Sequence, residues 1–250
     1  MSAGTYTADE MMTVAAARMV RNGTSLFVGI GLPSAAANLA RLTHAPDAIL
    51  IYESGAIGAK PSVLPLSIGD SELAETSDTV VSLVELFNYW LSGRKIGMGF
   101  LGAAQIDKYG NLNSTVIGPY RKPKVRLPGA GGAPAVAANC GEVLITLRHN
   151  TKAFVDQLDF STTTFPGKGP LAVISDLGIL TPDPIRKELE LTSVHPGVTV
   201  EQAIAATGWP LQVAADVRTT QSPSVTELRV LRDLNERTAQ DHAAQNYARG

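Results

Sequence analysis

Hydrophobic residues along this chain fall into two kinds of segment, short continuous runs and longer stretches with one apolar face. The first long stretch opens with the T-x-x-E pattern of a capping box at Thr7–Glu10 and continues at helical spacing to Asn22-Gly23. Next, the apolar run Ser25–Ile30 passes through a glycine turn into an alanine-rich stretch that ends near Leu42. The pattern predicts a helix, a strand, a glycine turn and a second helix.

Further apolar runs have the length of strands. They are Ala48–Tyr52, Thr79–Leu83, Ile96–Phe100, Val143–Leu147 and Leu171–Ser175. Runs that are apolar on both faces are typical of parallel strands covered by helices on each side, because half-exposed antiparallel strands alternate apolar and polar positions. We therefore expect an α/β fold, a mostly parallel sheet flanked by helices.

The last third of the chain carries two more helix signals. Val198–Thr207 contains a T-x-x-Q start and is followed by Gly208, whereas Ser224 opens a helix that the pattern extends to about Arg237. No internal repeat, low-complexity segment or clear linker is visible. The simplest organisation is a single domain over residues 1–250 with a helical extension from about residue 198.

Composition narrows the class of protein. Of the 250 residues, 44% are hydrophobic and 18% are charged, as in compact globular chains. The 21 basic and 23 acidic residues give a formal net charge of −2, so no excess of cations favours nucleic acid as a partner. The apolar runs are too short for a membrane span, and the N-terminus lacks the pattern of a secretory signal.

Cysteine and histidine bear on the compartment and on metal binding. Cys140 is the single cysteine, and the four histidines show no metal-ligand spacing with it. We therefore expect no internal disulfide, no metal site and a location in the reducing cytoplasm.

An acidic residue after a predicted strand is the first candidate for chemistry. Glu53 lies in Tyr52–Ala59 (YESGAIGA), directly after an apolar run and before two glycines. Ligands of parallel α/β sheets gather at the carboxyl ends of the strands, so this side chain is placed where active sites form. The alternative is a solvated loop acid, which is the ordinary role of a glutamate.

A glycine loop is the second candidate. Pro128–Pro134 (PGAGGAP) exposes the amides of Gly129, Gly131 and Gly132, which can approach an anion or a developing oxyanion closely. The loop matches neither the Walker A pattern nor the G-x-G-x-x-G fingerprint of dinucleotide sites. A flexible turn is the alternative.

Two further stretches are less specific. Gly29 and Gly31 stand between a strand and a helix, where amides could hold a phosphate or pantetheine, or could simply permit a tight turn. Gln105 lies in the glycine- and amide-rich stretch 97–113 and could orient a ligand, although satisfying buried backbone is the plainer role. A basic cluster follows at Arg121, Lys122, Lys124 and Arg126; it could meet acidic phosphates, but a solvated charged face is the usual explanation.

Taken in order, GIGLP, E-S-G-x-I-G-A, LGAAQID with GNLN, and PGAGGA resemble the β subunit of family I CoA-transferases, in the glutaconate and 3-oxoacid branch. The resemblance runs from about Thr7 to about Gly197. The family's signature at its nucleophile reads Ser-Glu-Asn-Gly; here Tyr52 replaces the Ser and Ser54 replaces the Asn, whereas Glu53 matches. The resemblance implies a NagB/RpiA/CoA-transferase-like fold with Glu53 as the nucleophile.

The resemblance also implies a covalent route. Glu53 would attack an acyl-CoA thioester to form a mixed anhydride, the CoA thiolate would convert it to a glutamyl-CoA thioester, and an incoming carboxylate would reverse these steps. An ionised glutamate needs no adjacent base. Coenzyme A would be a substrate, with no permanently bound cofactor. The resemblance assigns the oxyanion amide to Gly131 or Gly132, and we expect Gly29, Gly31, Gly129 and Gln105 to bind coenzyme A.

The family divides two similar halves between α and β polypeptides. The resemblance therefore implies a CoA-transferase α subunit as partner and a β chain that is inactive alone. Two other functions fit part of the pattern: an acyl-CoA hydrolase of the steroid ring-opening type, whose branch is altered at the glutamate motif, and a ligand-sensing module, which leaves Glu53 unexplained. The acyl group stays open, as does the choice among Arg94, Arg121 and an α-subunit residue as partner of a distal carboxylate.

Overall fold

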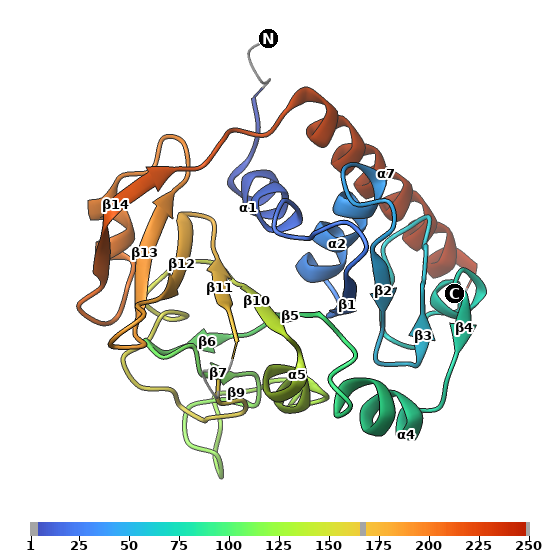
Figure 1. The fold of residues 1–250 in the computed structure, drawn as a ribbon, viewed down its shortest axis with the longest axis horizontal. Coiled ribbons are helices and arrows are strands. Elements are labelled where there is room, and N and C mark those ends of the chain that lie inside the picture. The colour runs from blue at the N-terminus through green and yellow to red at the C-terminus, as the bar shows by residue number, and fades with distance from the viewer. Residues whose placement is uncertain (1–4, 166–168, 249–250) are drawn as a thin grey trace.

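A single large sheet forms the centre of the computed structural model, which describes residues 5–165 and 169–248 (Figure 1). The strand order of this ten-stranded sheet is β14-β13-β12-β11-β10-β5-β1-β2-β3-β4. Its strands are β1 (Ser25–Val28), β2 (Ile49–Ile51), β3 (Ala56–Ile57), β4 (Thr79–Val80), β5 (Met98–Gly102), β10 (Glu142–Thr146), β11 (Leu171–Ile174), β12 (Gly178–Pro182), β13 (Leu189–Val194) and β14 (Gln212–Thr219). Two small hairpins stand apart from it, β6 (Gln105–Ile106) with β7 (Leu112–Asn113), and β8 (Val116–Ile117) with β9 (Val125–Arg126).

The middle of the sheet is parallel, which confirms the predicted fold class. β2, β1, β5, β10 and β11 pair in parallel, and Phe27 of β1 lies between Ile51 and Gly99 in register. Successive β1 residues enter different cores, Leu26 and Val28 on one face and Phe27 on the other. Both faces of these strands are therefore covered, which explains their continuous apolar runs.

Helices cover both faces (Figure 1). On one face, α1 (Ala8–Ala17), α2 (Leu32–Leu42) and α7 (Val225–Ala248) contact one another and share a core with the sheet. On the other face lie α4 (Leu83–Glu85), η1 (Leu86–Leu91), which is a wide π-helical turn, and α5 (Ala133–Asn139). The short helices α3 (Ser71–Glu75) and α6 (Val200–Ala205) complete the set.

The predicted helix starts are confirmed. The side chain of Thr7 accepts from the backbone N–H of Glu10 and the Glu10 carboxylate accepts from that of Thr7, a reciprocal capping box that opens α1. Thr199 and Gln202 form the same arrangement at α6. α7 follows Ser224 as expected, but it continues well beyond Arg237, to Ala248.

Two predictions about strands and helices were wrong. Thr79–Leu83 is not a buried parallel strand: only Thr79–Val80 pairs, antiparallel to β3 at the sheet edge, and both residues are exposed. The region from about residue 198 is not purely helical, because β14 lies between α6 and α7. β12 and β13 also escaped prediction, since partly exposed residues separate their buried ones and polar residues such as Thr181 and Glu190 interrupt their apolar positions.

A buried histidine lies where the last parallel strand meets the C-terminal elements. The two ring nitrogens of His149 contact Ser175 Oγ at 3.1 Å and Thr207 Oγ1 at 2.9 Å, and the ring stacks on Phe154. Burial lowers the pKa of His149 from 6.5 to about 4. The folded protein therefore holds this imidazole neutral under conditions in which an unfolded chain would protonate it.

Acid should consequently destabilise the fold through His149. Between pH 6.5 and about 4 the unfolded chain binds a proton that the folded chain does not, so the unfolding free energy contributed by this group falls as pH falls. The loss should reach about 3 kcal/mol at the lower end and vanish above neutrality. Urea unfolding across this pH range measures it, and His149→Gln should reduce the slope. An equal slope in the variant would assign the acid sensitivity to other groups.

Candidate active site

Glu53 lies in a tight turn immediately after β2. The backbone N–H of Gly55 donates to the Tyr52 carbonyl at 2.9 Å, which closes the turn. Gly55 has a φ of 96°, and a Cβ there would lie 2.0 Å from the Val81 carbonyl oxygen, so only glycine fits. The chain after β3 therefore supports the turn from outside and fixes the position of Glu53.

Tyr52 anchors the same turn from inside. Its side chain is fully buried, and its hydroxyl lies 3.0 Å from Ser34 Oγ and 3.3 Å from Asn38 Nδ2, both on α2. The departure from the family signature at this position thus has a structural role, because the phenol ties the turn that carries Glu53 to a helix.

The Glu53 carboxylate lies against the glycine loop. A Cβ on Gly131 would lie 3.4 Å from Glu53 Oε2, and one on Gly132 would lie 3.5 Å from Glu53 Cδ. Glu53 is half-buried, and no residue in the described ranges donates a hydrogen bond to its carboxylate or forms an ion pair with it. The structure therefore brings the two first candidates of the sequence together and leaves the carboxylate free to react.

Three backbone N–H groups of the glycine loop, those of Ala130, Gly131 and Gly132, have no acceptor among the described residues. Gly129 cannot be one of them, because its N–H donates to the Ser114 carbonyl at 2.8 Å. The Ser114 hydroxyl in turn donates to the Gly129 carbonyl at 2.8 Å. Within residues 5–165 and 169–248, the N–H groups of Gly131 and Gly132 have no acceptor. These two amides, just before α5, are available to an oxyanion.

A cavity of about 450 Å³ joins these groups. It opens at the carboxyl ends of β1, β2 and β5, where ligands of parallel sheets bind. Among its described lining residues only Glu53 and Ser114 have polar side chains. The remaining lining is apolar or backbone, contributed by Phe27, Val28, Gly29, Ile30, Ile68, Leu101, Gly102, Ala103, Ala104 and residues 127–133.

Of the other predicted site residues, two line the cavity and two lie outside it. Gly29 and Gly129 line the cavity with Glu53. Gly31 does not line the cavity. It is the N-cap residue of α2 and has a φ of 85°. Gln105 is also outside, and its buried amide is held by its neighbours: it donates to Asp159 Oδ2 at 3.1 Å and accepts from Asn113 Nδ2 at 2.7 Å. Its contacts match the structural alternative rather than ligand binding.

Two residues of the site were missed. Ser114 follows the amide-rich stretch and holds the glycine loop through Gly129, and Phe87 of η1 lies where a Cβ on Gly132 would meet its ring at 2.8 Å. Neither carries a sequence signal, because a loop serine and an aromatic residue in an apolar segment are ordinary. Only the fold shows what they support.

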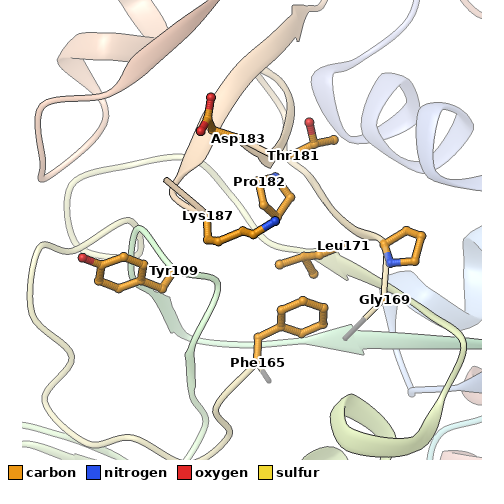
Figure 2. Close-up of a pocket in the computed structure, with 9 residues that line it drawn as sticks. Tyr109, Phe165, Gly169, Leu171, Thr181, Pro182, Asp183 and Lys187 are labelled. Atoms are coloured by element: carbon orange, nitrogen blue, oxygen red, sulfur yellow. The ribbon is translucent and has the colours of Figure 1, made fainter. Parts of the chain in front are cut away.

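A larger cavity of about 540 Å³ lies elsewhere, around the start of β11 and the turn after β12. Figure 2 shows Phe165 and Leu171 around it, with the side chain of Lys187 reaching toward Pro182. Its one acid, Asp183, accepts from the backbone N–H groups of Arg186 and Ile185 in the turn, which lowers the pKa of its carboxyl. Because none of the predicted catalytic groups lines it, size does not identify this cavity as the reaction site.

The described residues offer neither a metal site nor a membrane-spanning helix. Over the described part of the chain, no group of three or more His, Cys, Asp or Glu side chains is arranged to hold a metal ion. Likewise, none of the described helices combines the length and apolar character needed to cross a bilayer.

Comparison with known proteins identifies the family. A sequence model of the family described as Coenzyme A transferase matches residues 9–206. The chain belongs to the coenzyme A transferase family. Among members of this family, it is 57% identical to the B subunit of 3-oxoadipate CoA-transferase from Pseudomonas knackmussii, over 96% of this chain and 97% of that protein.

Two other relatives extend the comparison within and beyond the coenzyme A transferases. The B subunit of glutaconate CoA-transferase from Acidaminococcus fermentans is 32% identical, over 91% of this chain and 92% of that one. The crystal structure of that enzyme superposes with a TM-score of 0.84, covering 92% of this chain and 95% of the other. The cholesterol ring-cleaving hydrolase IpdB subunit of Rhodococcus jostii is 28% identical over 81% of each chain.

Proposed function

We propose that this chain is the β subunit of a CoA-transferase that moves CoA between an acyl-CoA and a carboxylic acid through a covalent intermediate on Glu53. The observation that carries the proposal is the Glu53 carboxylate, unpaired among the described residues, beside the Gly131 and Gly132 amides, which have no acceptor there. The 57% identity to a 3-oxoadipate CoA-transferase polypeptide supports it independently.

The reaction proceeds as two exchanges at carbonyl carbons. A Glu53 carboxylate oxygen attacks the thioester carbon, the carbon–sulfur bond breaks, and CoA leaves as the thiolate, giving a mixed anhydride. The thiolate then attacks Glu53 Cδ and releases the donor carboxylate, leaving a glutamyl-CoA thioester. The acceptor carboxylate repeats the two steps in reverse, so acyl-CoA leaves and Glu53 is restored. Each step conserves charge without a general acid or base.

This chain positions Glu53, stabilises the negative charge of the intermediates and limits the access of water. The turn held by Tyr52 and Gly55 fixes Glu53 for attack. Each tetrahedral intermediate carries a negative oxygen, to which the Gly131 and Gly132 amides can donate; one such donor is typically worth about 3 kcal/mol. The apolar lining limits water, which would hydrolyse the anhydride.

The relatives also suggest which acyl group is transferred and which partner completes the enzyme. The 57% identical relative is named for 3-oxoadipate, so we assign a 3-oxo dicarboxylic acid as the substrate class. Arg94 and Arg121 lie outside the cavity lining, and we assign the cation for the distal carboxylate to an α subunit. That subunit also closes the cavity over Glu53.

We further propose the cytoplasm as the compartment and coenzyme A as a passing substrate, with no permanently held cofactor. The single cysteine supports the compartment, because one thiol cannot close an internal disulfide. Burial raises the pKa of the Cys140 thiol to about 12.

The α and β chains should transfer CoA only when combined. We expect the assembled enzyme to convert a 3-oxo dicarboxylic acid to its CoA thioester with succinyl-CoA as donor, with parallel double-reciprocal plots typical of a ping-pong reaction. Omitting the carboxylate acceptor should stop product formation. Acceptor-independent release of CoA at the full rate would indicate a hydrolase instead, and turnover by the β chain alone would overturn the two-subunit assignment.

A further inference from the structure

A basic hairpin leads out of the glycine loop. β8 and β9 pair with Ile117 opposite Val125, and the Lys124 N–H donates to the Ile117 carbonyl at 2.8 Å. Toward the cavity the ladder continues, because the Leu127 N–H donates to the Thr115 carbonyl at 3.0 Å. Figure 1 shows this hairpin, beside the β9 label, projecting from the body of the molecule. The hairpin and the oxyanion loop are therefore one continuous, hydrogen-bonded piece.

The tip of the hairpin concentrates unpaired positive charge. Arg121, Lys122 and Lys124 are exposed, and none forms an ion pair with a described carboxylate. Several cations elsewhere are paired, for example Arg21 with Glu142 at 2.7 Å and Lys108 with Glu188 at 3.2 Å. A chain of formal charge −2 thus gathers cations with no intervening acid at one projecting point. Like charges gathered on one short turn repel each other, and an anion bound among them would relieve that repulsion.

The hairpin is anchored so that its tip is presented rather than loose. The Tyr120 ring stacks on Phe160 with centroids 5.3 Å apart, and the Gly118 N–H donates to Asp159 at 3.0 Å. Arg126 differs from these three cations because its guanidinium already has a partner. It lies 5.1 Å from the Tyr120 ring centroid and donates to the Tyr120 carbonyl. Arg126 holds the turn, and the three tip cations remain available.

Distance selects the anion. An extended chain advances about 3.3 Å per residue, so Lys124 and Lys122 can lie up to roughly 15–25 Å from Gly129 along the hairpin. The pantetheine arm of coenzyme A has this scale, and it separates the reacting sulfur from the phosphates of the nucleotide end. When the thioester lies at Glu53, the phosphates fall at the level of the hairpin tip.

We propose that Arg121, Lys122 and Lys124 form the subsite that binds the phosphate groups at the nucleotide end of acyl-CoA. The proposal rests on the proposed function, since it places the thioester of the same substrate at Glu53. The proposal gives two roles to one continuous segment: the glycine loop takes part in the reaction, and the hairpin tip binds the phosphates of the substrate.

The test compares two double variants of the assembled α–β enzyme. Lys122→Gln with Lys124→Gln removes two tip charges, and Lys152→Gln with Arg229→Gln removes two exposed charges elsewhere. With acyl-CoA, the hairpin variant should raise KM about tenfold, with kcat little changed and a weaker dependence of KM on salt. The control variant should match wild type.

A truncated substrate separates the explanations. With acyl-pantetheine, which lacks the phosphates, the hairpin variant and wild type should have equal kcat/KM. Equal losses on both substrates would overturn the subsite while leaving the transferase function intact. Weaker association of the α and β chains in the hairpin variant, measured by analytical ultracentrifugation, would also overturn it and assign the tip to docking between the two chains. Failure of wild type on both substrates would instead reject the proposed function.

Discussion

Replacing Glu53 by glutamine should abolish CoA transfer in the assembled enzyme, with kcat reduced on the order of 10⁴-fold or more. The amide is neutral and cannot open the thioester or carry CoA as a glutamyl thioester. Because no described residue forms a hydrogen bond or ion pair with the Glu53 carboxylate, the variant should keep the wild-type melting temperature. Steady-state kinetics and thermal melts together measure both effects.

Trapping the intermediate gives Glu53 a direct assay. Wild-type enzyme incubated with acyl-CoA and then borohydride should show a mass change on the peptide containing Glu53, because borohydride reduces a glutamyl thioester. Glu75→Gln, at an exposed glutamate of α3, is the matched control and should retain both activity and trapping. An active Glu53→Gln enzyme, or an unmodified Glu53 peptide from a working complex, would remove Glu53 as the nucleophile.

Adding one methyl group at Gly132 should have the second largest effect. The new Cβ would lie 2.8 Å from Phe87 Cζ, so the loop or the ring must move, and the amides of Gly131 and Gly132 move with the loop. We expect kcat for Gly132→Ala to fall about a hundredfold, with little change in the KM for acyl-CoA, because these amides act chiefly on the tetrahedral intermediates. Initial-rate kinetics on the assembled enzyme measures this split.

A second substitution shows whether the clash is the cause. Phe87→Leu shortens the side chain that the methyl group meets, so Gly132→Ala with Phe87→Leu should recover part of the lost rate. Gly69→Ala adds a methyl group where the nearest atom, Ser67 Oγ, is 3.7 Å away, and it should behave as wild type. Unchanged kcat in Gly132→Ala would contradict the assignment of the oxyanion donors.

The parallel centre of the fold was predictable because strands that are buried on both faces appear in the sequence as short continuous apolar runs. β1 and β10 each contain three consecutive apolar residues, Leu26–Val28 and Val143–Ile145, since helices cover both sides. β12 and β13 were not predictable in the same way. β12 pairs antiparallel with both of its neighbours and β13 with one of them, and their buried residues alternate with partly exposed ones. Such short segments resemble loops until a neighbour is known.

The candidate site was predictable in its backbone and less so in its side chains. Glu53 and the Gly131–Gly132 pair were found because strand ends and bare glycines leave sequence patterns, and the structure brings them together. Gln105 shows the limit. Whether an amide faces a cavity or its neighbours depends on which way a two-residue strand turns its side chains, and here Asp159, distant in sequence, decides it.

The contact between the first and last helices has a consequence for synthesis. Arg18, just after α1, forms hydrogen bonds with Glu227 of α7 across 209 positions of sequence, and Leu231 of α7 is buried in the core beside α1 and α2. During synthesis α1 therefore cannot complete its packing until α7, about two hundred residues later in the chain, has emerged from the ribosome. A chain released early would carry that uncovered apolar face into the cell, where chaperones and proteases compete for it.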